Sequence, residues 1–307
     1  MNLALLAAAA TGMQVGAATV ASRFVLAEIP PLTLAMLRYA IALTCLLPFL
    51  VPSLLRGWWP APVAAGVPPR PAVVWLDWLV MALLGIGQFG ILIAALNFGL
   101  QYVSAARAAL VFSLFPLLTL LLSAALGRER ITPGLLGGVV ASIGGVAIAL
   151  WPGLHQGGTG HWRGEIAILA SAFIGALCSV LYRPYLQRYP TLQVSGFAML
   201  ASVVFLAVAA WPEAWPARLG ALTDRAWGVV VFVGGSSAVG YLLWLYALKR
   251  ESPTRVTVFL ALNPVTAAAL GQLVLGEALD RWTGAAIAMI ALGLWLATRR
   301  VSIPARR

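Results

Sequence analysis

Long apolar runs, separated by short polar or proline- and glycine-containing turns, fill most of the chain. Each run has about 20 residues, which is the length that an α-helix needs to cross the hydrocarbon core of a bilayer. The runs are too long and too continuous for the alternating strands of a membrane barrel. We therefore predict an all-α membrane protein with ten transmembrane helices, at Leu3–Leu26, Leu32–Val51, Val73–Leu100, Ala105–Leu126, Gly134–Trp151, Gly164–Tyr182, Leu192–Trp211, Ala226–Leu248, Val256–Gly276 and Thr283–Ala297.

The polar and helix-breaking residues of the fourth predicted helix recur in the ninth at a constant spacing. Adding 148 to the number of each residue in the first set gives the number of its counterpart in the second. Four such matches without a gap indicate an internal duplication. The pairs are Ser104 and Ser252, Arg107 and Arg255, Pro116 and Pro264, and Glu129 and Glu277.

Ten helices in two halves leave five helices in each half. Because five is an odd number, the second half must enter the membrane from the side opposite to the first. We expect two inverted repeats at residues 1–152 and 163–307, joined by a linker at 153–162. This architecture is typical of secondary transporters. A count of nine helices is the alternative, and it would break the symmetry of the repeat.

The composition requires lipid as the solvent for most of the surface. Hydrophobic residues make up 62% of the 307 residues and charged residues 9%, whereas soluble domains carry about 25% charged residues. A soluble fold of this size could not bury so much apolar surface. The net charge of +11 therefore indicates the basic loops of a membrane protein, and no nucleic-acid partner is expected.

The basic residues are distributed unequally between the two sides of the predicted bundle. Of the 20 Lys and Arg, thirteen lie on the side of both termini, six lie on the opposite side, and Arg38 lies within a predicted helix. By the positive-inside rule, both termini are expected in the cytoplasm. We expect a multi-pass protein of the bacterial inner membrane. Small residues in the fifth and tenth helices could pack the halves together or form a dimer seam, so monomer and homodimer both stay open.

Several absences narrow the chemistry. All nine acidic residues fall at predicted helix ends or in loops, so no carboxylate is expected at mid-membrane depth for a proton or sodium site. Cys45 and Cys178 lie in apolar runs, and His155 and His161 lie between the halves, without the spacing of metal ligands. Walker and zinc-protease motifs are also absent from the sequence. We expect neither a metal nor another cofactor.

Polar side chains within the predicted helices are the candidate substrate-binding residues, because polar groups are costly in lipid and usually face the bundle interior. Amides are stronger candidates than serines, since a hydroxyl can bond to its own backbone. Aromatic residues near them could line the same cavity. For each residue the alternative is an interhelical hydrogen bond that only holds the bundle together. The candidates are Gln14, Arg38, Gln88, Asn97, Ser179, Tyr182, Ser237, Tyr241, Trp244 and Asn263.

Arg38, Pro116 and Pro264 each allow two interpretations. We expect the guanidinium of Arg38 to extend towards the membrane surface, and the alternative is that it binds an anionic group such as a substrate carboxylate. Pro116 and Pro264 remove backbone hydrogen bonds at corresponding places in the two halves. Paired breaks of this kind point to a binding site near the bilayer midplane, which makes both prolines candidate hinges. The alternative is that they are prolines of the kind that membrane helices tolerate.

With these features together, the chain resembles the EamA-type members of the drug/metabolite transporter superfamily over essentially its whole length. Members of the family commonly have adjacent Gly and Glu in a turn, as Gly276-Glu277 has here, whereas Arg128 separates Gly127 from Glu129 in the corresponding turn of the first half. The resemblance rests on ten helices in two halves, on Pro116 and Pro264, and on the turns Gly127-Arg128-Glu129 and Leu275-Gly276-Glu277, each before a glycine-rich helix.

The resemblance implies export or exchange of small metabolites by alternating access, through a central cavity between the halves. Within the superfamily the chain looks most like the bacterial aromatic amino-acid exporters. Multidrug or nucleotide-sugar transport is the alternative within the superfamily, although nucleotide sugars would need several cations where the chain has only Arg38 deep enough. A non-transporting scaffold and an intramembrane enzyme are the alternatives outside it.

Overall fold

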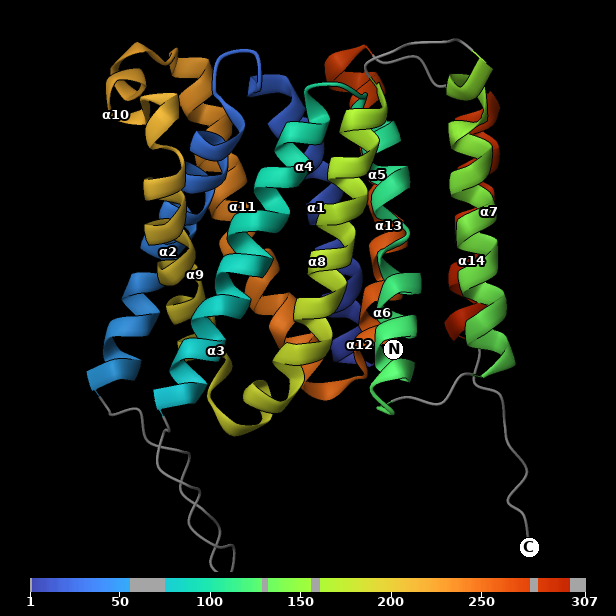
Figure 1. Ribbon diagram of the computed structural model, residues 1–307, viewed down its shortest axis with the longest axis horizontal. Coiled ribbons are helices and arrows are strands. Elements are labelled where there is room, and N and C mark those ends of the chain that lie inside the picture. Colours follow the sequence, from blue (N-terminus) through green and yellow to red (C-terminus); the bar gives the residue numbers. More distant parts are fainter. Residues whose placement is uncertain (1, 56–74, 129–131, 156–160, 277–280, 299–307) are drawn as a thin grey trace, which may run out of the picture.

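The computed structural model describes residues 2–55, 75–128, 132–155, 161–276 and 281–298 (Figure 1). These residues form helices joined by short turns, and none of them lies in a strand. Eight of the helices that they form are long and apolar enough to cross a membrane. The long helices stand roughly side by side in one bundle. The predicted all-α class is therefore confirmed.

Five of the eight candidate spans are continuous α-helices, and three are interrupted. The continuous ones are α1 (Leu3–Val25), α2 (Pro31–Leu55), α8 (His161–Arg188), α9 (Thr191–Ala209) and α11 (Asp224–Arg250). The interrupted ones are α3 (Trp75–Gly85) with η1 (Ile86–Ile91) and α4 (Leu92–Leu100), α5 (Ala105–Phe112) with α6 (Phe115–Ala125), and α12 (Pro253–Thr257) with η4 (Val258–Ala261), α13 (Leu262–Leu270) and η5 (Gly271–Leu275). The short elements η2 (Trp211–Glu213), α10 (Trp215–Arg218) and η3 (Leu219–Ala221) connect α9 to α11.

Two further helices form a pair of their own at the edge of the bundle. They are α7 (Pro133–His155) and α14 (Arg281–Thr298), which correspond to the fifth and tenth predicted helices. They pack against each other more extensively than against any other element, at the right of Figure 1. Neither is among the eight helices that the described residues present as candidate spans. Ten crossings therefore stay a prediction.

The two interrupted spans that carry the repeated residues begin in the same way and run in opposite directions. Ser104 precedes α5 and accepts a hydrogen bond from the backbone N–H of Arg107, and Ser252 precedes α12 and accepts one from Arg255. Such caps satisfy N–H groups that the first helical turn leaves free. The early segment α5 packs against the late segment α13, and α6 packs against α12. The two spans are therefore antiparallel neighbours (Figure 1).

Both spans change their helical hydrogen bonding close to the repeated prolines. The first stops at Phe112 and restarts at Phe115, so Pro116 lies in the first turn of α6. The second tightens into the 3₁₀ segment η4, after which Pro264 lies in the first turn of α13. A proline in a first turn removes no helical hydrogen bond, because the N–H groups there have no partner within the helix. The interruption comes just before each proline.

Several helix ends differ from the predicted ones. The predicted sixth helix ends at Tyr182, whereas α8 continues to Arg188 through Pro184. The helices α7 and α8 also reach His155 and His161, which were placed between the halves. Apolar runs mark the part of a helix that lipid covers, and polar residues can continue the same helix beyond it. The turns with Glu129 and Glu277, the centre of the linker and most of the segment between the second and third predicted helices lie outside the described residues.

Candidate functional site

A small cavity lies inside the bundle, and elements from both halves of the sequence line it. Its volume is about 60 Å³, which is room for a few water molecules. Residues of α1, α2, η1, α4, α5 and α6 line it from the first half, and residues of α11 and η4 line it from the second. Six of the ten predicted binding residues are among its lining: Gln14, Arg38, Gln88, Ser237, Tyr241 and Trp244.

Arg38 supplies a positive charge to the wall of the cavity. Its residue is 6% exposed, so the expectation that it extends to the membrane surface is wrong. Its Nε donates a 2.7 Å hydrogen bond to Oγ of Ser237 on α11, and the guanidinium carbon lies 5.6 Å from the centre of the Tyr39 ring. The α11 helix offers Arg38 a hydrogen-bond acceptor inside the bundle, and the arginine side chain turns towards it.

Two amides add neutral polar groups to the same cavity. Gln88 lies in the π-helical segment η1 and is 7% exposed, and its Oε1 has no hydrogen-bond partner in the described part of the chain. Single π-helical turns inside longer helices are frequent at functional sites. Gln14 donates a 3.1 Å hydrogen bond from Nε2 to Oγ of Ser236, which joins α1 to α11. One amide therefore holds two helices together, and the other has an oxygen free for a ligand.

Aromatic rings form the apolar part of the lining. The rings of Tyr39, Phe89 and Tyr241 form one cluster, with centroid distances of 4.9 Å from Tyr39 to Phe89, 3.9 Å from Phe89 to Tyr241 and 6.3 Å from Tyr39 to Tyr241. Trp244 packs edge-on against Phe115 at 6.2 Å. Rings in these arrangements attract one another beyond the burial of their surface. The cavity thus combines one cation and a few polar groups with a mostly aromatic and aliphatic wall.

The other four predicted binding residues lie elsewhere in the bundle. Asn97 donates a 3.1 Å hydrogen bond from Nδ2 to the carbonyl of Pro31, so it links α4 to α2. Ser179 donates to the carbonyl of Gly175 in its own helix. Tyr182 and Asn263 are each 1% exposed and do not line the cavity. A role in binding for these residues stays a prediction, as does the role of Pro116 and Pro264 as hinges.

Several residues of the cavity were not predicted. Tyr39 follows Arg38 directly, and Thr11 lies three residues before Gln14 on the same face of α1. Residues three or four apart on a helix are neighbours. The prediction that Gln14 lines the cavity could therefore have been extended to Thr11. Phe112 at the end of α5 and Phe115 at the start of α6 also line the cavity. Their apolar side chains do not differ in type from the residues that face lipid, so the sequence pattern carries no signal for them.

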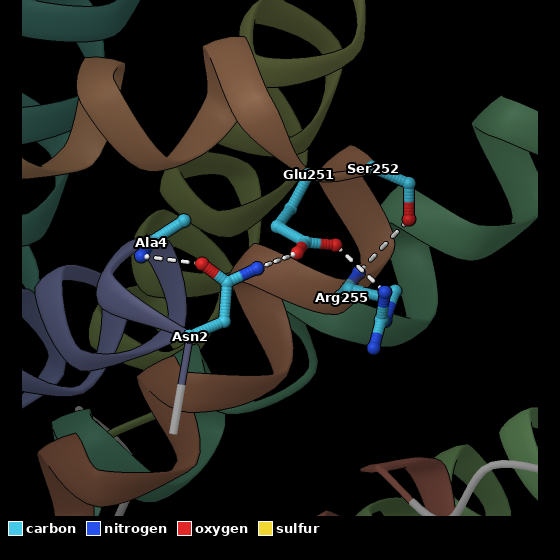
Figure 2. Close-up of polar contacts among 5 residues, drawn as sticks. All are labelled: Asn2, Ala4, Glu251, Ser252 and Arg255. Carbon is cyan, nitrogen blue, oxygen red and sulfur yellow. Dashed lines mark hydrogen bonds and ion pairs between the residues drawn. The ribbon is translucent and has the colours of Figure 1, made fainter.

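Polar contacts close both ends of the antiparallel pair of spans. At the start of α5, Arg107 forms an ion pair with Glu165 in the first turns of α8. At the start of α12, Arg255 donates a 2.7 Å hydrogen bond from Nη1 to Oε2 of Glu251. The other oxygen of Glu251 accepts a 2.7 Å hydrogen bond from Nδ2 of Asn2, at the start of α1 (Figure 2). We call these contacts the Arg107 latch and the Arg255 latch.

A third polar contact lies at the turn between α8 and α9. Tyr189 donates a 2.6 Å hydrogen bond from its hydroxyl to Oδ2 of Asp77, in the first turn of α3. Burial, followed by the hydrogen bond and the negative charge of Asp77, raises the pKa of Tyr189 to about 12. The phenol therefore keeps its proton at neutral pH and holds this turn against α3. No group of three or more metal-ligating side chains occurs among the residues that the structure describes.

Comparison with known proteins connects this arrangement to transport. An uncharacterized transporter of Archaeoglobus fulgidus is 28% identical over 286 residues, covering 93% of this chain and 95% of the relative. A probable terminal-alkyne amino-acid exporter of Streptantibioticus cattleyicolor is 30% identical over 66% of each chain. The aromatic amino acid exporter YddG of Ancylobacter novellus is 31% identical over 47% of this chain and 50% of its own.

The whole bundle also matches a solved fold. A crystal structure superimposes with a TM-score of 0.68 at 25% identity, and the match covers 96% of both chains. The family model that describes EamA-like transporters matches the chain in two stretches, residues 2–151 and 162–299. Together with the eight apolar helices, these matches identify a multi-pass membrane protein. The chain belongs to the EamA-like transporter family.

Proposed function

We propose that the protein is a secondary transporter that exports or exchanges small amphipathic metabolites, with amino acids, and aromatic ones in particular, as its preferred solutes. The single observation that carries the proposal is the cavity that elements of both halves line. Its wall joins a cation and an amide to aromatic rings, which suits a solute with a charged end and an apolar body. The names of two relatives, both amino-acid exporters, support the same substrate class.

Alternating access follows if the two halves are inverted repeats of five helices each. The antiparallel packing of the two capped spans supports this arrangement. So do the two separate matches to the family model and the constant offset of 148 between Ser104 and Ser252. Both termini then lie on one side, and the excess of basic residues on that side favours the cytoplasm of a bacterial cell.

The volume of the cavity indicates that the solute enters a different conformation. Ligand pockets are commonly about 300–1,000 Å³, well above the volume of about 60 Å³ seen here. We infer that the cavity widens on one side at a time when the solute enters. None of the described residues that line the cavity is acidic, so we infer uniport or exchange without a carboxylate relay.

Solute flux in proteoliposomes tests the function. The purified protein should move radiolabelled L-phenylalanine or L-tryptophan faster than protein-free liposomes, and preloaded unlabelled amino acid should accelerate the uptake by exchange. A panel that also contains a lipophilic cation and a nucleotide sugar separates amino-acid transport from the multidrug and nucleotide-sugar alternatives. Absence of flux for every solute in the panel would contradict the proposal.

A further inference from the structure

We propose that Arg38 binds a carboxylate of the transported solute, and that Ser237 positions the guanidinium for this task. The inference rests on the proposed transport function and extends it to a substrate class, which is organic carboxylates with an apolar or aromatic body. Three observations carry it: an unpaired charge, a fixed orientation of the guanidinium, and an unused acceptor in the same cavity.

The charge of Arg38 has no counter-ion in the described part of the chain. Among the described residues, no carboxylate lies within 4 Å of the guanidinium, and no acid lines the cavity. The acids of the described residues have other partners or lie at helix ends, as with Glu213, which accepts hydrogen bonds at the start of α2. A buried charge without a partner is costly. An anion that enters the cavity removes that cost.

The hydrogen bond to Ser237 fixes the guanidinium and leaves most of it available. The hydroxyl of Ser237 accepts from Nε of Arg38 and donates to the carbonyl of Val233 one turn earlier. This directional chain ties the arginine to the backbone of α11. Nε is one of five N–H donors in a planar fork, and the remaining donors make no hydrogen bond to a described residue. A fork held in this way suits bidentate binding of a carboxylate.

The remaining lining matches the rest of such a solute. The Oε1 of Gln88 is buried without a donor partner, which makes it an acceptor for an ammonium group. The rings of Tyr39, Tyr241 and Trp244 supply an apolar wall between the polar groups. An α-amino acid presents a carboxylate, an ammonium and a side chain. The groups of the lining therefore match those of an aromatic α-amino acid better than those of an amine or a neutral drug.

Four related solutes test the role of the carboxylate in proteoliposomes containing the full chain. L-phenylalanine has both charged groups, 3-phenylpropanoate lacks the ammonium, and L-phenylalaninamide and phenethylamine lack the carboxylate. We expect both carboxylates to inhibit uptake of labelled phenylalanine, and we expect both amines to inhibit about 100-fold less effectively, because they leave the buried guanidinium unpaired. If the amines move and inhibit as well as phenylalanine does, the function stands and the inference is overturned. If none of the four moves, the proposed function itself fails.

Variants assign this selectivity to the arginine. Arg38→Gln should lower the affinity for phenylalanine about 10- to 100-fold and bring the preference for phenylalanine over phenylalaninamide close to one. A purely structural role would lower yield and rate without changing that preference. Arg38→Lys keeps the charge but loses the fork, so it should keep the preference with a weaker affinity. If Arg38→Gln does not fold, the Arg38→Lys variant and the selectivity of the unmodified protein still decide whether Arg38 binds the carboxylate.

A small inorganic anion is the other source of negative charge for Arg38. Replacing chloride by sulfate at constant ionic strength should leave phenylalanine uptake unchanged if the solute supplies the carboxylate. Uptake that depends on chloride in the unmodified protein and loses this dependence in Arg38→Gln would assign the site to chloride and overturn the inference.

Ser237→Ala tests whether Ser237 positions the guanidinium of Arg38. It should weaken phenylalanine binding less than Arg38→Gln does, and the preference for the carboxylate should be retained.

Discussion

At the scale of single residues, two buried amides of the same bundle have different surroundings. Gln88 lines the cavity, whereas Asn97 lies outside it and donates a hydrogen bond from Nδ2 to the carbonyl of Pro31. The side-chain oxygen of each amide is buried without a partner among the described residues. Removal of an interhelical hydrogen bond in a membrane protein costs about 0.6 kcal/mol on average. Removal of a ligand-binding group leaves the empty protein almost unchanged.

We predict that Gln88→Ala lowers phenylalanine transport at least several-fold with little change in thermal stability, because its oxygen holds no helix. Asn97→Ala should do the reverse, with a lower melting temperature in detergent and a transport rate per folded molecule close to normal. Both are measured on the same preparations by thermal unfolding and by uptake into liposomes. Equal effects of the two substitutions on transport would remove Gln88 from the site.

The sequence predicted these residues as a group because an amide in a membrane helix has to find a partner. It could not separate them, since the partner depends on rotation and packing of helices that are far apart along the chain. Arg38 illustrates the same limit. The sequence showed how far Arg38 lies from the end of its helix. It did not show its hydrogen-bond acceptor inside the bundle, Ser237, which lies 199 residues away along the chain.

At the scale of helices, α1 approaches its neighbour closely through two glycines. Gly12 and Gly16 lie four residues apart and face the backbone of η4 and α13 at Phe259 and Asn263. A Cβ added at Gly16 would lie 2.7 Å from the carbonyl oxygen of Asn263, so the backbone of one helix would have to move. Small residues at four-residue spacing allow membrane helices to pack in this way.

We predict that Gly16→Ala destabilises the bundle by about 1–3 kcal/mol through overpacking, although alanine favours an isolated helix by about 1 kcal/mol over glycine. Gly235→Ala on α11 is the control, because a Cβ there meets no atom within 4 Å. It should leave stability unchanged or raise it slightly. Unfolding in detergent compares the two, and a change in the same direction for both would show that Gly16 is not a packing contact.

The positions of the apolar helices were predictable because bilayer thickness sets the length of each run. The positions at which two of the spans are interrupted were predictable from the sequence, but the local helical geometry of the interruptions was not. Pro116 and Pro264 mark where two spans change, yet each proline lies in a first helical turn, and the irregular segment precedes it. The π-helical segment η1 around Gln88 left no such signal, because its residues are those of an ordinary membrane helix.

At the scale of the whole molecule, the two latches lie at opposite ends of the bundle that contains the cavity. The Arg107 latch ties α5 to α8, and the Arg255 latch ties the turn before α12 to the start of α1. Because α5 and α12 begin at opposite ends of an antiparallel pair, the two latches face opposite sides. In an alternating-access cycle, one of them has to open while the other stays closed.

We predict that Glu165→Gln biases the protein towards opening at the Arg107 end, and that Glu251→Gln biases it towards the other end. A partly exposed ion pair contributes up to about 1 kcal/mol, so each change should shift the populations about two- to fivefold. A cysteine in place of Thr11, which lines the cavity and is 4% exposed, serves as reporter after Cys45 and Cys178 are replaced. The measurement is its rate of labelling by an impermeant thiol reagent added to one side of oriented proteoliposomes.

Asp224→Asn is the matched control for loss of a carboxylate. Asp224 is exposed at the start of α11, at the end opposite to Glu251, and forms no ion pair with the residues that the structure describes. Its substitution should change labelling from neither side, because it joins no two helices. Faster labelling from the same side in Glu165→Gln and Glu251→Gln would mean that both latches face one side of the membrane. Two inverted halves around a shared cavity could not produce that result.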